Sequence, residues 1–288
     1  MNKVSGIQHI LSVSDLHLEF YGDEALWSRV LPTPDKNALL ILAGDILIWK
    51  YGGKFKFNSP IVRLLTKLSS EFGAVVYVPG NHEYYRGIAG NYYDNKLRDF
   101  IKQAELSNVF FLNNDSLIVN NTVKIVGSTL WTDMRSPNDP SFEFRVSRAY
   151  NQGKSPLNDF NYIRFSDDKR TFPLLNLRSV LLLHQRSVRF LEKELAKDFD
   201  GEVFVVTHHL PSLLLIDDKY LGHYLTPAYA SSVEYLSEGV SKWFYGHSHQ
   251  VAEKRIRGLD TLFISNASGY KHQIDKQFDA NKIFYTFG

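Results

Sequence analysis

The chain of 288 residues contains no cysteine. This absence excludes disulfide bonds, thiolate zinc sites, iron–sulfur clusters and catalytic cysteine nucleophiles. Long hydrophobic runs are also missing, because no apolar stretch approaches the roughly 20 residues that span a bilayer. The N-terminal apolar residues are interrupted by His9, Ser12 and Asp15, a pattern unlike that of a signal peptide. We therefore expect a cytoplasmic protein that does not enter a membrane.

Neither sign of charge dominates the sequence. Lys and Arg total 33 against 31 Asp and Glu, which gives a formal net charge of +2. A nucleic-acid-binding protein is more often markedly basic, with its charge clustered, so nucleic acid is a possible partner that the composition does not indicate. The motifs G-x-x-x-x-G-K-[ST], G-x-G-x-x-G and G-x-S-x-G are absent as well. P-loop and serine-hydrolase chemistry therefore have little support.

Composition and periodicity favour one layered domain over residues 1–288. Hydrophobic residues make up 44% and charged residues 22% of the chain, as in ordinary globular proteins. Apolar β-rich runs alternate with amphipathic runs, which is typical of an α/β or α+β sandwich of mixed sheets flanked by helices. The expected strands are 7–13, 38–42, 74–78, 109–112, 123–127, 203–206, 243–245 and 261–264, and the expected helices are 59–72, 92–106 and 178–199.

Two stretches break this alternation, at about 132–173 and 211–227. The first is rich in Asn, Asp, Pro, Ser and Arg, with aromatic residues interspersed. Long loops inside a compact domain are usually functional or disordered. We predict that both stretches are irregular rim elements around a functional site.

Five short segments with metal-binding side chains each follow a strand-like run. A single histidine near a strand end is more often a surface or structural residue, but the joint occurrence of these segments indicates a shared site. Carboxylate and amide oxygens mixed with imidazole suit Mn, Fe or Zn, so we predict a dinuclear metal centre. The segments are S-D-L-H at 14–17, A-G-D at 43–45, G-N-H-E at 80–83, T-H-H at 207–209 and G-H-S-H at 246–249.

The position of these segments predicts that they meet. Residues i and i+2 of a strand point to the same side, so Asp15 with His17, and His247 with His249, each present two ligands if the backbone stays extended. Ligands in open α/β sheets lie beyond the carboxyl ends of the strands. Glycines are expected where the chain leaving a strand needs unusual dihedrals or a close approach. Those that precede ligand residues are Gly44, Gly80 and Gly246.

These motifs resemble those of the calcineurin-like metallophosphoesterase superfamily, whose pattern is D-x-H, G-D, G-N-H-[DE], a later H, and G-H-x-H. All five blocks occur in family order from Asp15 to His249, so the resemblance covers nearly the whole chain. The contexts D-L-H-L-E-F and V-T-H-H-x-P-S look like a subgroup of small bacterial-type phosphoesterases. One departure is Ile46-Leu47-Ile48 after G-D, where some members carry further acidic residues.

The resemblance implies the metallophosphoesterase fold and two metal sites that share the carboxylate of Asp45. No ligand position of the family pattern is missing. The cofactors would be two divalent ions drawn from Mn, Fe and Zn. One site would be formed by Asp15, His17, Asp45 and His249. The other would be formed by Asp45, Asn81, His208 and His247.

Such a metal pair implies hydrolysis of a phosphate ester. Two divalent ions about 3.5–4 Å apart can lower the pKa of a shared water, and the resulting bridging hydroxide can attack phosphorus in line. Asn81 would bind a metal through its amide oxygen and keep its NH₂ group as a donor. His82 is predicted to protonate the leaving oxygen as the general acid. The predicted catalytic residues are therefore His82, Asn81 and Asp45.

Several nearby residues have open or weaker assignments. Glu83 either orients a neighbouring histidine or only begins a helix. His209 either contacts substrate or packs within a loop, and His184 is predicted to be structural. The residues predicted from position and type to contact the phosphate or the leaving group are Tyr84, Tyr85, Arg86 and Arg145.

The leading hypothesis is a dinuclear metal-dependent phosphoesterase acting on a small phosphorylated substrate. A slight preference for phosphodiesters follows if the two irregular stretches form a recess for a second substituent. One alternative is a nuclease of the same superfamily acting on DNA or RNA, against which the nearly neutral charge argues. Another is a non-catalytic protein-binding scaffold, against which the complete set of ligands argues.

Overall fold

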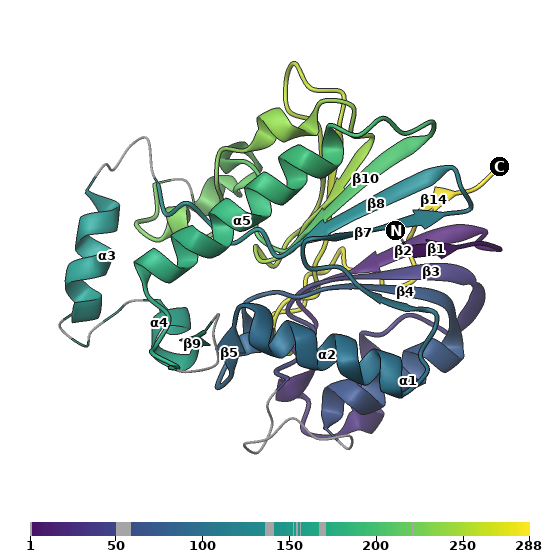
Figure 1. Ribbon diagram of the computed structural model, residues 1–288, viewed down its shortest axis with the longest axis horizontal. Helices are drawn as coiled ribbons and strands as arrows, with labels where there is room; N and C mark the ends of the chain where they lie inside the picture. The colour runs from purple at the N-terminus through teal and green to yellow at the C-terminus, as the bar shows by residue number, and fades with distance from the viewer. Residues whose placement is uncertain are drawn as a thin grey trace.

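Two β-sheets lie face to face at the centre of the fold, and helices cover their outer faces (Figure 1). This arrangement confirms the predicted layered α/β fold. The structure is a computed structural model, and it describes residues 2–49, 59–135, 141–151, 153, 155, 157–166, 171–220 and 222–288.

The first sheet has five strands in the order β14-β2-β3-β4-β6. Strands β2, β3, β4 and β6 are parallel, and β14 pairs antiparallel with β2 at the edge. The carboxyl ends of the parallel strands therefore point the same way. The bounds are β2 His9–Val13, β3 Asp35–Ala43, β4 Phe72–Val78, β6 Val109–Phe111 and β14 Ile283–Thr286.

The second sheet has seven strands in the order β1-β7-β8-β10-β11-β13-β12. Its central strands β8, β10, β11 and β13 are parallel. The bounds are β1 Asn2–Val4, β7 Asp115–Val119, β8 Val123–Ser128, β10 Glu202–Thr207, β11 Lys242–Phe244, β12 Val251–Lys254 and β13 Leu262–Asn266. A small further sheet pairs β5 Ile88–Ala89 with β9 Arg164–Phe165.

One apolar cluster fills the space between the two large sheets. Ile41 and Val76 from the first sheet pack in the same cluster as Ile125 and Val206 from the second, and all four side chains are fully buried. Strands buried on both faces are continuous apolar runs rather than alternating ones, which is why they could be recognised in the sequence. This core fixes the two sets of strand ends relative to each other.

The long helices cover the outer faces of the sheets (Figure 1). In α1, Pro60 occupies the first turn, and Ile61, Leu64, Leu65 and Leu68 form a fully buried stripe at helical spacing. Helix α5 ends earlier than the predicted position 199. The bounds are α1 Pro60–Glu71, α2 Asn91–Gln103 and α5 Leu177–Leu195.

The predicted irregular stretch at 132–173 contains regular structure, which corrects that prediction. Helices α3 (Phe142–Asn151) and α4 (Asn158–Tyr162) and strand β9 lie within it. Phe142 and Phe160 are each only 1% exposed and Val146 is 2% exposed, so one or two buried apolar residues anchor each of these short helices. Positions 136–140 and 167–170 of this stretch lie outside the described residues.

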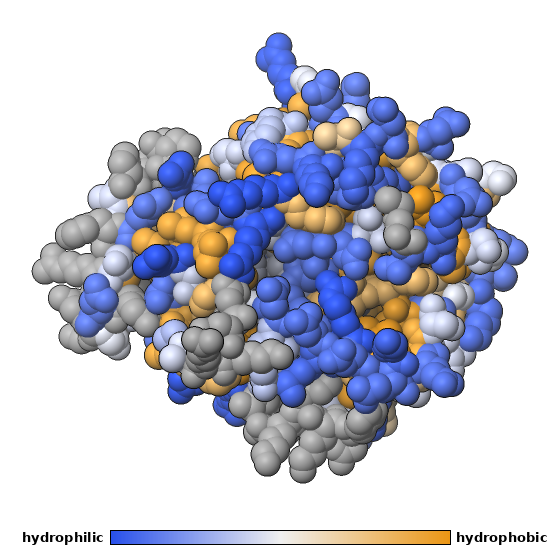
Figure 2. Space-filling model, viewed as in Figure 1, coloured by the Kyte–Doolittle hydropathy of each residue, from blue (hydrophilic) through white to orange (hydrophobic). Residues whose placement is uncertain are grey.

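The remaining connections contain several 3₁₀ helices. They are η1 Leu18–Phe20, η2 Glu24–Arg29, η3 His82–Tyr84, η4 Leu213–Leu215, η5 Asp218–Tyr220, η6 Thr226–Ala228 and η7 Glu234–Ser237. The predicted irregular stretch at 211–227 is thus a chain of single turns. Over the described part of the chain, no helix is both long and apolar enough to cross a membrane. Hydrophobic residues reach the surface in patches separated by hydrophilic ones (Figure 2).

Candidate metal centre

The predicted ligands follow the carboxyl ends of strands in both sheets. They come after β2, β3 and β4 of the first sheet and after β10 and β11 of the second. Their ligand atoms form groups within 4.8 Å of one another. These groups are Asp15 with His17 and His249, Asp45 with His208 and His247, and His17 with Asp45 and His82.

Asp45 lies between the two groups of histidines. Its Oδ1 atom is 3.3 Å from His208 Nε2, and its Oδ2 atom is 3.9 Å from His17 Nε2. On the first side, His17 Nε2 lies 3.0 Å from His249 Nε2. On the second side, His208 Nε2 lies 3.2 Å from His247 Nδ1. The two oxygens of one carboxylate thus face two separate clusters of imidazole nitrogens.

Asn81 belongs to the second cluster, and Asp159 accepts a hydrogen bond from its amide group. Its Oδ1 atom is 3.2 Å from His208 Nε2, while its Nδ2 group donates to Asp159 Oδ1 at 2.8 Å. The same carboxylate oxygen accepts the Tyr85 hydroxyl at 2.9 Å. The Asn81 NH₂ group, which the sequence suggested as an available donor, is therefore engaged by Asp159, and the amide oxygen faces the cluster.

The ligands converge through left-handed backbone rather than through extended strands, which corrects the expected geometry. Residues with positive φ and a side chain are uncommon, because each costs about 1–2 kcal/mol and persists only where its surroundings fix it. Here the His247 backbone N–H donates to both carboxylate oxygens of Asp15, at 2.9 and 3.0 Å. The values of φ are 53° at Asp15, 45° at His17, 54° at Asp45, 67° at His247 and 51° at His249.

The glycines before the ligands allow the close approach that was predicted. A Cβ atom on Gly80 would lie 2.2 Å from Asp45 Oδ1, and one on Gly246 would lie 2.7 Å from Asp15 Oδ2. Both distances are far below van der Waals contact. Only glycine leaves room for the carboxylates of Asp15 and Asp45 at these positions.

Glu83 has a role that neither sequence interpretation described. Its Oε2 accepts the backbone N–H groups of Asp45 at 3.0 Å and Gly80 at 2.7 Å. Its Oε1 accepts the N–H of Ile46 at 2.7 Å and the hydroxyl of Tyr77 at 2.9 Å. The carboxylate therefore joins the two ligand-bearing loops after β3 and β4. Burial, followed by the charge of Asp45, raises the pKa of Glu83 to about 7.

Glu19 is a residue of the site that the sequence reasoning missed. Its side chain is 4% exposed, its Oε1 accepts His82 Nδ1 at 3.2 Å, and the same oxygen lies 3.5 Å from His17 Nδ1. The carboxylate thus orients His82 and borders a predicted metal ligand. The signal was present in the motif D-L-H-L-E-F, where the glutamate stands two residues after His17. Asp159, by contrast, had no local signal.

The carboxylates and imidazoles of the site shift one another's pKa values. Burial opposes ionisation of Asp45, but His208 and His82 hold the pKa of this carboxyl well below its usual value. Burial lowers the pKa of His208, yet the Asp45 carboxylate overcomes it and raises the pKa to about 10. Burial likewise opposes the charge of His82, but Asp45 and Glu19 raise its pKa to about 9. Metal binding must displace the proton of a ligand histidine such as His208.

Two residues predicted to contact substrate, Tyr84 and His209, are buried and bonded to other protein groups. Tyr84 is 1% exposed and donates its hydroxyl to Asp94 at 2.7 Å, so it has almost no surface with which to touch a substrate. His209 is 2% exposed, stacks on Trp131 and lies 3.1 Å from the Thr129 carbonyl through Nδ1, as a packed loop residue would.

Three further residues named in the sequence analysis differ in their surroundings. Tyr85 stacks on His82 with ring centroids 4.1 Å apart, which places it at the site. Arg145 is exposed on α3 and donates to Ser141 Oγ at 2.8 Å. His184 is buried in α5, 3.1 Å from the Leu130 carbonyl, which agrees with a structural role.

The donor set fits two divalent cations. Carboxylate, amide and imidazole groups gather in a largely buried cluster, and imidazole nitrogens of His17 and His249 lie 3.0 Å apart. Such a mixture of oxygen and nitrogen donors suits Mn, Fe or Zn. Glu19 and Asp159 supply the outer hydrogen bonds that orient metal ligands and their neighbours in proteins.

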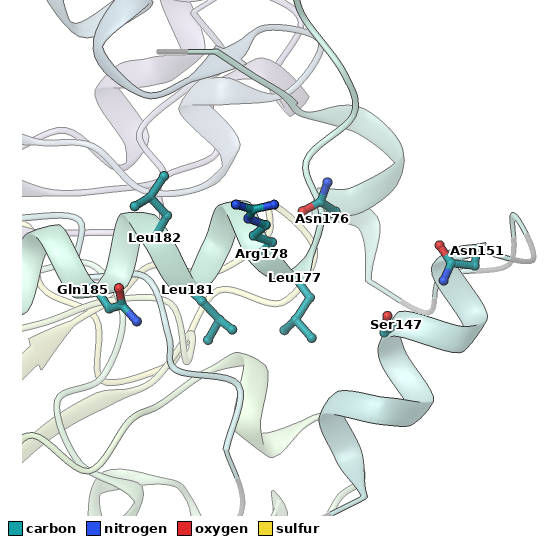
Figure 3. Close-up of a pocket in the computed structure, with 8 residues that line it drawn as sticks. All are labelled: Ser147, Asn151, Asn176, Leu177, Arg178, Leu181, Leu182 and Gln185. Atoms are coloured by element: carbon teal, nitrogen blue, oxygen red, sulfur yellow. The ribbon is translucent and has the colours of Figure 1, made fainter.

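A separate cavity of about 540 Å³ lies between α3 and the start of α5 (Figure 3). Ser147 and Asn151 line it from α3, and Leu177, Arg178 and Gln185 line it from α5. None of the predicted metal ligands borders this cavity. It is therefore distinct from the candidate metal centre.

Comparison with known proteins agrees with this geometry. An uncharacterized protein of Acanthamoeba polyphaga mimivirus is 28% identical over 283 residues, which cover 91% of each chain. A phosphopantetheinyl hydrolase from Mycobacterium tuberculosis has a similar fold, with a TM-score of 0.62 and 17% identity over 93% of this chain and 92% of that one. The family model described as calcineurin-like phosphoesterase matches residues 8–251. The chain therefore belongs to the calcineurin-like phosphoesterase family and is a hydrolase that acts on phosphate esters.

Proposed function

We propose that the protein is a dinuclear metal-dependent phosphoesterase with a preference for small phosphodiesters. The observation that carries this proposal is the position of Asp45, whose two carboxylate oxygens face the His208 cluster at 3.3 Å and His17 at 3.9 Å. A single carboxylate between two clusters of imidazoles is the arrangement that a pair of cations requires.

The chain supplies a complete ligand set for each cation. Bound divalent ions lower the pKa of a coordinated water and offset the charge on the phosphate oxygens. Asp45 belongs to both sets. The first set is Asp15, His17, Asp45 and His249. The second set is Asp45, Asn81, His208 and His247.

In this proposal, His82 is the general acid. Glu19 holds its Nδ1 atom at 3.2 Å, and Tyr85 stacks on its ring at 4.1 Å. The Nε2 atom is thereby left to face the leaving oxygen and to donate a proton to it. The alcohol would otherwise leave as an alkoxide, so this proton matters most for esters of poorly acidic alcohols.

The preference for diesters rests on elements that border the ligands. Helix α4, from the 132–173 stretch, reaches Asn81 through Asp159. Tyr229, which follows the 211–227 stretch, lies 4.7 Å from His247 between ring centroids. A phosphodiester carries a second substituent that needs a recess, and these segments stand on two sides of the site.

The direct test is turnover of bis-p-nitrophenyl phosphate against p-nitrophenyl phosphate by protein reconstituted with Mn²⁺, Fe²⁺ or Zn²⁺. We expect hydrolysis that depends on added metal and a higher kcat/KM for the diester. Elemental analysis of the purified protein identifies the metals it retains. Absence of hydrolysis of both esters with every metal would overturn the proposed activity, and a higher kcat/KM for the monoester would overturn the diester preference.

Two variants separate metal binding from proton donation. Asp45→Asn removes the shared carboxylate, so we expect it to lose both metals and activity together. His82→Ala removes a neighbour of the ligands, so we expect near-normal metal content and turnover slower by about 10²–10⁴-fold. Elemental analysis of metal content and kcat measured on the same preparations distinguish loss of metal from loss of proton donation. If His82→Ala strips the metals, its role as the acid is wrong.

A further inference from the structure

Exposed aromatic rings stand beside the ligands of the first metal. Phe20, in η1, is 52% exposed, and its ring centroid lies 6.0 Å from that of His17 and 5.6 Å from that of Tyr270. Tyr270 in turn packs against His17 at 4.5 Å and His249 at 4.6 Å. One edge of the metal centre is therefore bordered by an aromatic surface that ends in an exposed phenyl ring.

Two more exposed rings lie near the centre, one against a predicted ligand and one against the tyrosine that stacks on His82. Tyr229 is 37% exposed and lies 4.7 Å from the ring of His247, a ligand of the second metal. Tyr162, in α4, is 47% exposed and lies 5.6 Å from Tyr85, which stacks on His82. We call Phe20, Tyr162 and Tyr229 together the aromatic mouth.

The gathering of these rings is informative because their elements are far apart in the sequence. A single exposed aromatic residue is ordinary, since much of any protein surface is apolar. Exposed apolar groups that collect around a binding site more often mark a surface that a ligand covers. Residues 20, 162 and 229 have in common only their position around the metal ligands.

The aromatic rings of the mouth favour phosphate esters that carry a flat unsaturated ring. The faces of phenyl and phenol rings stack on flat unsaturated rings, and this recognition tolerates different bases because each base has such a face. The hydroxyls of Tyr162 and Tyr229 can also donate to polar edges of a ligand. A substrate whose substituent is a short aliphatic alcohol would not cover these rings, which would stay exposed to water.

We propose that the aromatic mouth stacks on the heterocycle of a nucleoside, so that the preferred substrates are phosphodiesters of nucleosides. This inference rests on the proposed phosphoesterase function and names its substrate class. The phosphate would lie at the metal pair, and the nucleoside would extend over at least one of the three exposed rings.

The test compares two diesters with the same leaving group, thymidine 5′-(p-nitrophenyl phosphate) and methyl p-nitrophenyl phosphate. Wild-type protein should have the higher kcat/KM for the thymidine ester. The triple variant Phe20→Ala, Tyr162→Ala, Tyr229→Ala should lose at least about tenfold of kcat/KM on the thymidine ester and less than about twofold on the methyl ester. An equal loss on both esters, or no loss on either, would overturn the proposal.

A control variant and a binding measurement complete the test. Tyr235 is 58% exposed and donates to Glu192, away from the ligands, so Tyr235→Ala should leave both kcat/KM values unchanged. Binding of adenosine monophosphate, measured by calorimetry, does not require turnover. If neither diester is hydrolysed, the proposed function fails, but weaker nucleotide binding by the triple variant would still support the aromatic mouth. Equal binding by variant and wild type, or no binding by wild type, would refute it.

Discussion

At the scale of single residues, the candidate site contains two buried carboxylates outside the predicted ligand set. Glu83 joins two ligand loops through their backbone N–H groups. Glu19 holds His82 at 3.2 Å and borders His17 at 3.5 Å. Because an imidazole that donates from Nδ1 has its other nitrogen fixed in direction, such carboxylates decide where Nε2 points.

We predict that Glu19→Gln slows hydrolysis by about 10–100-fold. The amide keeps the size of the side chain but accepts a hydrogen bond from His82 less strongly than a carboxylate. The loss should be larger for an alkyl diester than for a p-nitrophenyl diester, since the alkyl alcohol depends on a proton from His82. The measurement is kcat for both substrates, together with metal content.

The matched control for this variant is Glu24→Gln, on a nearby turn. Glu24 pairs with Arg63 on the surface, and its loss should change neither kcat nor the dependence on the leaving group. If Glu19→Gln slows both esters equally while metal content falls, Glu19 serves the ligand His17 instead of the acid His82.

At the scale of elements, helix α4 connects the 132–173 stretch to the metal centre. Asp159 on this helix accepts both the Asn81 amide and the Tyr85 hydroxyl. Strand β9 follows directly and pairs with β5, which lies shortly after the G-N-H-E segment. The stretch is thus attached to the loop after β4 by side-chain and backbone contacts.

We predict that Asp159→Ala weakens binding of the second metal by about 10–100-fold while the first is retained. Without the carboxylate, the Asn81 amide is free to rotate its oxygen away from His208. Stepwise metal titration followed by calorimetry measures the two affinities separately. Asn158→Ala, an exposed neighbour on the same helix, is the control. Loss of both metals, or of neither, would contradict this role for Asp159.

The sequence predicted the central strands of both large sheets and the convergence of the ligand segments, because each of these features depends on a short run of neighbouring residues. The buried parts of these strands, such as residues 38–43 of β3, are unbroken apolar runs, and each ligand segment follows one of them. The contacts of Glu19 and Asp159 that support the ligands could not be predicted from local sequence. Glu19 meets a histidine 63 residues away and Asp159 meets Asn81 78 residues away, so only the folded chain brings them together.

The backbone conformation of the predicted ligands could not be predicted from the sequence either. An alternating D-x-H pattern predicts extended backbone, but φ is 53° at Asp15 and 45° at His17. The bonds that hold Asp15 in place come from the N–H of His247, in another sheet. Helices α3 and α4 were missed for a related reason, since each is short and buries few apolar residues, such as Phe142 and Val146 in α3 and Phe160 in α4.

At the scale of the whole molecule, the predicted metal ligands follow strands of both sheets, so we expect metal binding to contribute to stability. Asp15, Asp45 and Asn81 follow strands of the five-stranded sheet, whereas His208 and His247 follow strands of the seven-stranded one. Cations bound between them would link the two layers at their carboxyl ends. Ligands that bind only the folded state stabilise it by mass action.

We therefore predict that a chelator lowers the unfolding temperature of the Mn²⁺-loaded protein. Saturation at 100–1,000 times Kd contributes about 3–4 kcal/mol, which corresponds to about 6–16 °C at the 2–4 °C per kcal/mol typical of larger domains. Calorimetry with and without chelator measures the shift. Asp45→Asn should abolish the shift, because both sites lose their shared ligand, whereas His82→Ala should preserve it. An unchanged unfolding temperature in wild-type protein would mean that the two sheets are not joined through metal.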